Sequence, residues 1–92
     1  MERNEVFALL NGERAYQDIR WANDQAERGT HIHNPTEWLV YIQDYLQEAL
    51  HIASREDDQI AHPKIMEIIR KIGGMSVAAM EQNGCEPRKY NG

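Results

Sequence analysis

The chain of 92 residues has few of the features that mark secreted, membrane-spanning or nucleic-acid-binding proteins. Its one cysteine, Cys85, cannot form an internal disulfide, and its first residues do not resemble an apolar secretion signal. No apolar run approaches the roughly 20 residues that cross a bilayer. A net charge of −5 argues against a basic face that would hold DNA or RNA backbone. We therefore expect a cytoplasmic protein that binds neither membrane nor nucleic-acid backbone.

The clearest structural signal is the start of a helix at residue 35. Asn34 can act as its N-cap, Pro35 suits the first helical position, and Glu37 can complete a capping box. Apolar residues then recur at helical spacing around roughly half of the circumference as far as residue 55. The pattern predicts a helix over 35–55.

Two further helices are predicted around it within a single domain. A charged turn over 55–59 leads to a helix over 61–83, with Pro63 near its start and Asn83-Gly84 at its end. Residues 4–27 form the N-terminal helix, which Asn11-Gly12 can bend or split, and 84–92 form a tail. No segment has the alternating pattern of a strand. The fold class is all-α, an N-terminal helix plus a long helical hairpin.

Both hairpin helices have apolar arcs near 180°, wider than a contact between two helices needs. A chain this short buries only about 60–65% of its unfolded surface, and one further helix can hardly cover both arcs. We therefore expect a homo-oligomer in which hairpins from several subunits complete a helical bundle.

Gly73 and Gly74 lie in the middle of a predicted helix, where each costs about 1 kcal/mol relative to alanine. Close approach of a neighbouring backbone or room for a ligand would offset this cost. Packing is the more common reason for such glycines.

Charged residues on the hairpin provide the candidate site chemistry. Glu37, Tyr41, Asp44 and Glu48 form one stripe, which either faces water or, with Glu67 of the next helix, holds Mg²⁺ through oxygen ligands. Arg70 and Lys71 suit a phosphate better than a metal, unless they lie on a solvated outer face. The loop histidines His31 and His33 are either solvated or share a metal ion.

The strings at residues 11–21, 37–49 and 69–72, the last followed by 78–84, resemble a family of small uncharacterised phage proteins, and the resemblance covers most of the chain. That family is loosely similar to the MazG-like all-α nucleotide pyrophosphohydrolases. The similarity implies an oligomeric bundle with Mg²⁺ held by acids on two adjacent helices, in an EExxE and an ExxD pattern. Asp44 and Glu48 only approximate the first pattern, and Arg70 stands where the second has aspartate.

These observations favour binding over catalysis, so we expect no cofactor. By analogy with small helical phage proteins that sequester nucleotide immune signals in the host cell, we expect a nucleotide-binding phage protein that acts as such a sponge. The alternatives are a Mg²⁺-dependent pyrophosphohydrolase and a helical module that inhibits a host protein. The expected ligand-binding residues are Arg14, Trp21, Tyr41, Tyr45, Arg70 and Lys71. The metal ligands of the hydrolase alternative are Glu37, Asp44, Glu48 and Glu67.

Overall fold

The protein consists of three helices in the computed structural model, which describes residues 1–28 and 31–89 but not the side chains of 24–28. The helices are α1 (Arg3–Arg28), α2 (Pro35–Arg55) and α3 (Asp58–Asn83). No strand occurs within the described ranges, so the all-helical fold class is confirmed. None of the helices in these ranges is both long enough and apolar enough to span a membrane.

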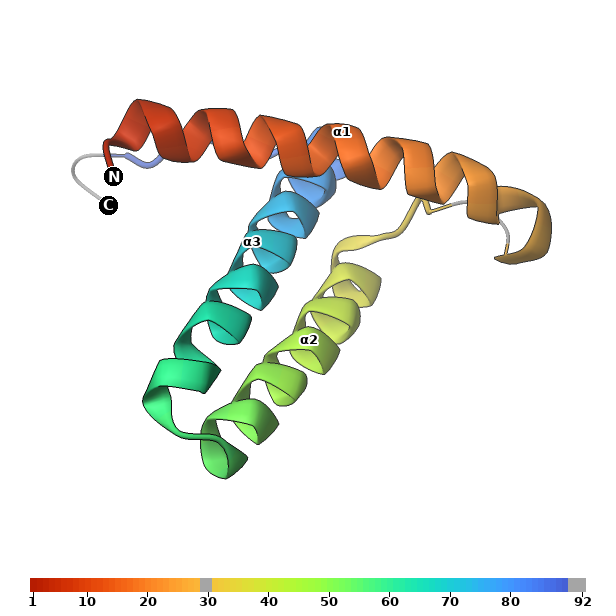
Figure 1. The fold of residues 1–92 in the computed structure, drawn as a ribbon. Helices are drawn as coiled ribbons and strands as arrows, with labels where there is room; N and C mark the ends of the chain where they lie inside the picture. Colours follow the sequence, from red (N-terminus) through yellow and green to blue (C-terminus); the bar gives the residue numbers. More distant parts are fainter. Residues whose placement is uncertain (29–30, 90–92) are drawn as a thin grey trace.

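The helices are arranged like a letter T (Figure 1). The antiparallel helices α2 and α3 form the stem, and α1 lies across the end where α3 finishes and α2 begins. Both ends of α1 extend beyond the stem, and the molecule measures 45 × 38 × 25 Å. One face of α1 therefore contacts the stem only along the middle of the helix.

The start of α2 has the capping box that the sequence predicts. The Asn34 side chain accepts a hydrogen bond from the backbone N–H of Glu37 at 2.8 Å, and the Glu37 carboxylate accepts one from the Asn34 N–H at 3.1 Å. Two N–H groups that the first turn leaves without helical partners are thereby satisfied. Local sequence alone accounts for this boundary.

The start of α3 differs from the expectation, because the helix begins at Asp58 rather than at residue 61. The Asp57 carbonyl accepts hydrogen bonds from the N–H groups of Ile60 and Ala61, which closes the first turn early. Pro63 consequently lies inside the helix, where its ring nitrogen cannot donate to the carbonyl of Gln59. The predicted start at residue 61, which would have placed Pro63 in the first turn where its missing N–H costs no hydrogen bond, was wrong.

The crossing of α1 over α3 depends on the glycine pair of α3. A Cβ atom at Gly73 would lie 2.7 Å from Cδ2 of Leu10, and one at Gly74 would lie 2.7 Å from Nε2 of Gln17. The two glycines thus let α1 approach the α3 backbone closely, as the packing hypothesis predicted. Gly12 does not interrupt α1, which runs unbroken from Arg3 to Arg28.

The core is small and lies where the three helices meet. Trp38 from α2 packs against Met75 and Ala78 from α3, and each is at most 5% exposed. Partly buried hydrophobic residues surround this cluster; they are Trp21, Ile42, Tyr45 and Ala79. Farther along the stem the buried hydrophobic residues are Ala49, Ala61 and Ile68. Much of the apolar arc of each hairpin helix therefore faces outward.

Candidate functional site

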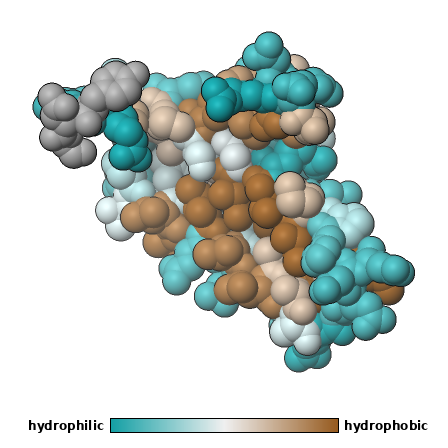
Figure 2. Space-filling model, turned by 90° about the vertical axis from the view of Figure 1, so that its left-hand side faces the viewer, coloured by the Kyte–Doolittle hydropathy of each residue, from teal (hydrophilic) through white to brown (hydrophobic). Residues whose placement is uncertain are grey.

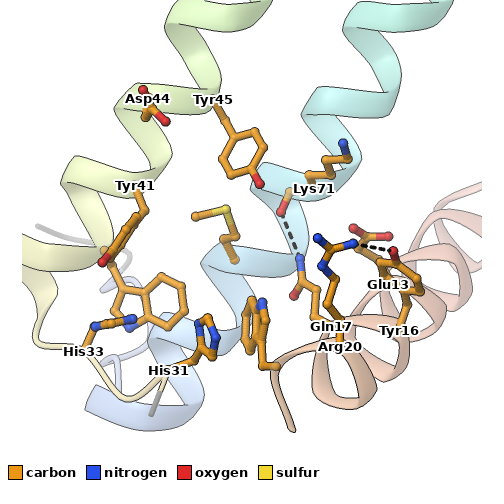
Figure 3. Close-up of a pocket in the computed structure, with 13 residues that line it drawn as sticks. Glu13, Tyr16, Gln17, Arg20, His31, His33, Tyr41, Asp44, Tyr45 and Lys71 are labelled. Atoms are coloured by element: carbon orange, nitrogen blue, oxygen red, sulfur yellow. Dashed lines mark hydrogen bonds between the residues drawn. The ribbon is translucent and has the colours of Figure 1, made fainter. Parts of the chain in front are cut away.

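A cavity of about 450 Å³ lies where the second half of α1 approaches the hairpin, with the segment from His31 to Asn34 at its edge (Figure 3). Its size is within the range of about 300–1,000 Å³ that is usual for small-molecule sites. Aromatic rings make up much of the lining, and a few charged or amide side chains face them. The lining residues are Glu13, Tyr16, Gln17, Arg20, Trp21, His31, His33, Trp38, Tyr41, Asp44, Tyr45, Lys71 and Met75.

One wall of the cavity is a continuous set of aromatic rings. Trp21 of α1 stacks on His31 with ring centroids 5.0 Å apart and contacts Trp38 of α2 at 5.9 Å. His33 meets the edge of Trp38 at 5.2 Å and lies 4.9 Å from Tyr41. Because each ring is held by its neighbours, this wall offers a preformed aromatic surface to a planar ligand.

The last turn of α3 fixes the loop that carries these histidines. Oε1 of Gln82 accepts hydrogen bonds from the Trp38 indole N–H and the His33 backbone N–H, both at 3.0 Å. Its Nε2 donates to the His31 carbonyl at 2.9 Å, while Asn83 donates to the His33 carbonyl at 3.1 Å. The position of the aromatic wall therefore depends on side chains about 50 residues away along the chain.

The opposite wall is polar and contains Lys71. Gln17 is only 6% exposed, and its Nε2 donates to the Lys71 backbone carbonyl at 3.3 Å (Figure 3). The Lys71 ammonium lies 5.8 Å from the ring centroid of Tyr45, a cation–π arrangement. Within the described part of the chain, no carboxylate lies within ion-pair distance of this ammonium. Lys71 thus contributes a positive charge that no described carboxylate neutralises.

Arg14 lies behind the aromatic wall and not in the cavity lining. Its guanidinium lies 5.4 Å from the Trp21 ring centroid and pairs with Glu81 at 2.8 Å and Asp18 at 2.9 Å. The hydrogen bond with Glu81 raises the pKa of Arg14 and lowers the pKa of Glu81 below its ordinary value of 4.5. Arg14 therefore joins α1 to α3 and supports Trp21 from behind.

Arg70 also forms an ion pair within the protein. Its Nε lies 3.3 Å from Oε2 of Glu13, a carboxylate that is only 8% exposed. Arg70 is not part of the cavity lining, whereas Glu13 is. The pair reduces the negative charge that Glu13 would otherwise bring to the cavity.

The structure does not gather the four candidate metal ligands into one site. Only Asp44 lines the cavity, and Glu37 is engaged in the capping box. Glu48 and Glu67 are exposed. No group of three or more His, Cys, Asp or Glu side chains in the described part of the chain is arranged to hold a metal ion, so His31 and His33 have no third such ligand among these residues.

Of the six expected ligand-binding residues, the structure places Trp21, Tyr41, Tyr45 and Lys71 around one cavity. Sequence reasoning missed Gln17 and Gln82. Gln82 follows Ala78 and Ala79 on an apolar face of α3, a pattern that could have identified it, whereas Gln17 lies among Glu13, Arg14 and Arg20 and has no such signal.

Comparison of the chain with known protein families, with curated proteins and with solved structures gives no significant match to any of them.

Proposed function

We propose that this protein binds a nucleotide-type small molecule in the aromatic cavity and does not act on it chemically. The observation that carries the proposal is the position of Lys71, whose unneutralised ammonium borders a cavity with an aromatic wall. A planar base and an anionic phosphate need these two surfaces close together.

The remaining lining residues suit the rest of such a ligand. Tyr41 and Tyr45 come from successive turns of α2 and can stack on a base, as Tyr41 is 46% exposed. Asp44 lies between them in sequence, and its carboxylate can accept hydrogen bonds from ribose hydroxyl groups. The phosphate would then lie toward Lys71, across the cavity from the histidines.

The charges limit the kind of nucleotide. Of the three cations among the expected ligand-binding residues, Arg14 and Arg70 are paired with carboxylates, which leaves Lys71. Asp44 would repel a highly charged polyphosphate chain. We therefore expect nucleoside monophosphates and cyclic phosphodiesters to bind more tightly than triphosphates. Sequestration of a nucleotide signal in the host cell of a phage is the role that such binding would serve.

The pyrophosphohydrolase alternative needs Glu37, Asp44 and Glu48 to work together with Glu67 on Mg²⁺. The dispersed placement of these acids favours binding without turnover. The third hypothesis is inhibition of a host protein, which does not require a ligand in the cavity.

Calorimetry with AMP, GMP, their cyclic forms and cyclic dinucleotides, in buffer containing EDTA, tests the proposal. Replacing Lys71 by Gln removes the charge but keeps a long polar side chain, and should weaken binding about ten- to a hundredfold. Lys64→Gln is the matched control, because Lys64 lies two turns earlier on α3 and pairs with Glu56 at 2.8 Å, outside the cavity.

Three results would contradict this proposal. If none of these ligands binds more tightly than millimolar, the host-protein reading becomes the better one. If Lys71→Gln binds as well as the parent, the phosphate lies elsewhere. If Mg²⁺ added to a nucleoside triphosphate gives pyrophosphate release that Glu48→Gln abolishes, the hydrolase reading replaces it.

A further inference from the structure

The side of the hairpin opposite the cavity is apolar and uncovered. Asp44 and Lys71 line the cavity, and the 100° helical repeat places Leu46 on α2 and Ile69 on α3 roughly opposite them. Figure 2 shows a continuous apolar surface on the hairpin below α1. We call the side of the hairpin opposite the cavity the apolar face; its exposed hairpin residues, placed by the helical repeat, are Leu39, Leu46, Leu50, Met66, Ile69 and Met80.

No charged residue interrupts the apolar face along most of the stem. The other positions near the same helical angle are Gln43 and Ala53 on α2 and His62, Gly73 and Ser76 on α3, although 27% of the chain is charged. The charged residues of this stretch instead lie toward the cavity or on the outer sides of the helices. A solvated helix face would not have this composition.

The first turns of α1 extend the apolar face. Leu10 packs against Gly73, and Val6 and Phe7 precede it by about one turn on the same side of α1. That part of α1 projects past α3 with no helix beneath it (Figure 1). Phe7 is 57% exposed and Val6 is 39% exposed, so the overhanging part of α1 and the stem form an open apolar corner.

The area of this surface matches what a stable dimer needs. Its side chains are between 39% and 67% exposed, and full burial of one such side chain removes on the order of 100 Å² of apolar surface. Together they offer roughly 400 Å², close to the roughly 500 Å² of apolar area in a homodimer patch of about 800 Å² per partner. An uncharged surface is also complementary to its own copy, since no like charges meet across a twofold axis.

We propose that a second copy of this chain covers the apolar face. The two hairpins pack face to face about a twofold axis as a four-helix bundle, and the overhanging first turns of each α1 cover the hairpin of the other copy. This contact supplies the larger core that the monomer lacks. The cavities remain open on the two outer sides, so dimerisation does not depend on ligand.

Sedimentation equilibrium between 1 and 100 μM tests the proposal. The parent should have twice the chain mass of 10.7 kDa, while Leu46→Glu and Ile69→Glu should shift to monomer with at least a hundredfold weaker association. Both residues are about half exposed in the single chain, so the helical circular dichroism signal should persist. Phe7→Ala should weaken association about tenfold through the α1 contact.

Val40→Glu and Ile60→Glu are the matched controls. They place the same charge on residues that are 60% and 53% exposed but that point away from the apolar face, and they should remain dimeric. A parent that is monomeric at 100 μM would overturn the proposal and leave the face to a different partner. Equal dissociation by the control variants would also overturn it. If Leu46→Glu and Ile69→Glu unfold, the association constants of Phe7→Ala and Val40→Ala are compared instead. Weaker association of Phe7→Ala alone supports the proposal, and equal association of the two variants overturns it.

Discussion

Replacing Gly74 by alanine should destabilise the protein, whereas the same replacement at Gly12 should stabilise it. Both glycines lie inside helices, so alanine gains about 0.5–1 kcal/mol of helix propensity at either position. At Gly12 a Cβ atom would meet nothing within 4 Å, and the full gain should appear.

At Gly74 the new methyl group would meet α1. It would lie 2.7 Å from Nε2 of Gln17 and 2.8 Å from Cγ of Glu13, and both of these residues are buried. Overpacking of this kind costs about 1–3 kcal/mol. Displacing Gln17 from the Lys71 carbonyl costs a further hydrogen bond, about 0.5–1.5 kcal/mol. After the gain in propensity, we expect a net loss of about 1–3 kcal/mol.

Urea unfolding followed by far-ultraviolet circular dichroism at one fixed protein concentration measures both variants. The two identical substitutions should differ by about 2–4 kcal/mol, equivalent to a difference in Tm of roughly ten degrees or more. Gly73→Ala should fall between them, because the atom that it approaches is the end of the flexible Leu10 side chain. If Gly74→Ala is as stable as Gly12→Ala, α1 does not cross α3 at this point.

Two further predictions concern contacts that join distant parts of the chain. The pKa of Glu81 is lowered in the folded state, so its contribution is present above the unfolded value of 4.5 and disappears as the pH falls through the lower folded value. The carboxylate is 53% exposed, so Glu81→Gln should cost only about 0.2–1 kcal/mol at pH 7, and this cost should shrink as the pH falls below 4.5; a difference that does not shrink with falling pH would contradict this assignment. Gln82→Ala leaves the buried Trp38 indole N–H without its partner and should cost about 1–3 kcal/mol and alter tryptophan fluorescence, whereas Gln47→Ala on the exposed side of α2 should do neither. Unchanged fluorescence in Gln82→Ala would show that Gln82 does not position the aromatic wall.

The sequence by itself determined the elements whose signals are local. Asn34, Pro35 and Glu37 lie within one turn of each other, so the hydrogen bonds that start α2 could be predicted without any tertiary contact. The grouping of Tyr41, Tyr45 and Lys71 was also accessible, because a hairpin brings the start of one helix beside the later part of the next. The start of α3 was not, because Pro63 was a stronger signal than the N-cap backbone of Asp57.

Only the tertiary structure decided which charged residues are available to a ligand. Arg14, Arg70 and Lys71 are all basic residues within predicted helices, and the sequence does not distinguish them. In the structure, Arg14 and Arg70 are paired with carboxylates across the contact between α1 and α3. Glu81 lies 67 residues from Arg14, and helical periodicity carries no information about contacts at that separation. The crossing of α1 over Gly73 and Gly74 sets these pairs, because it fixes which side chains of the two helices can reach one another.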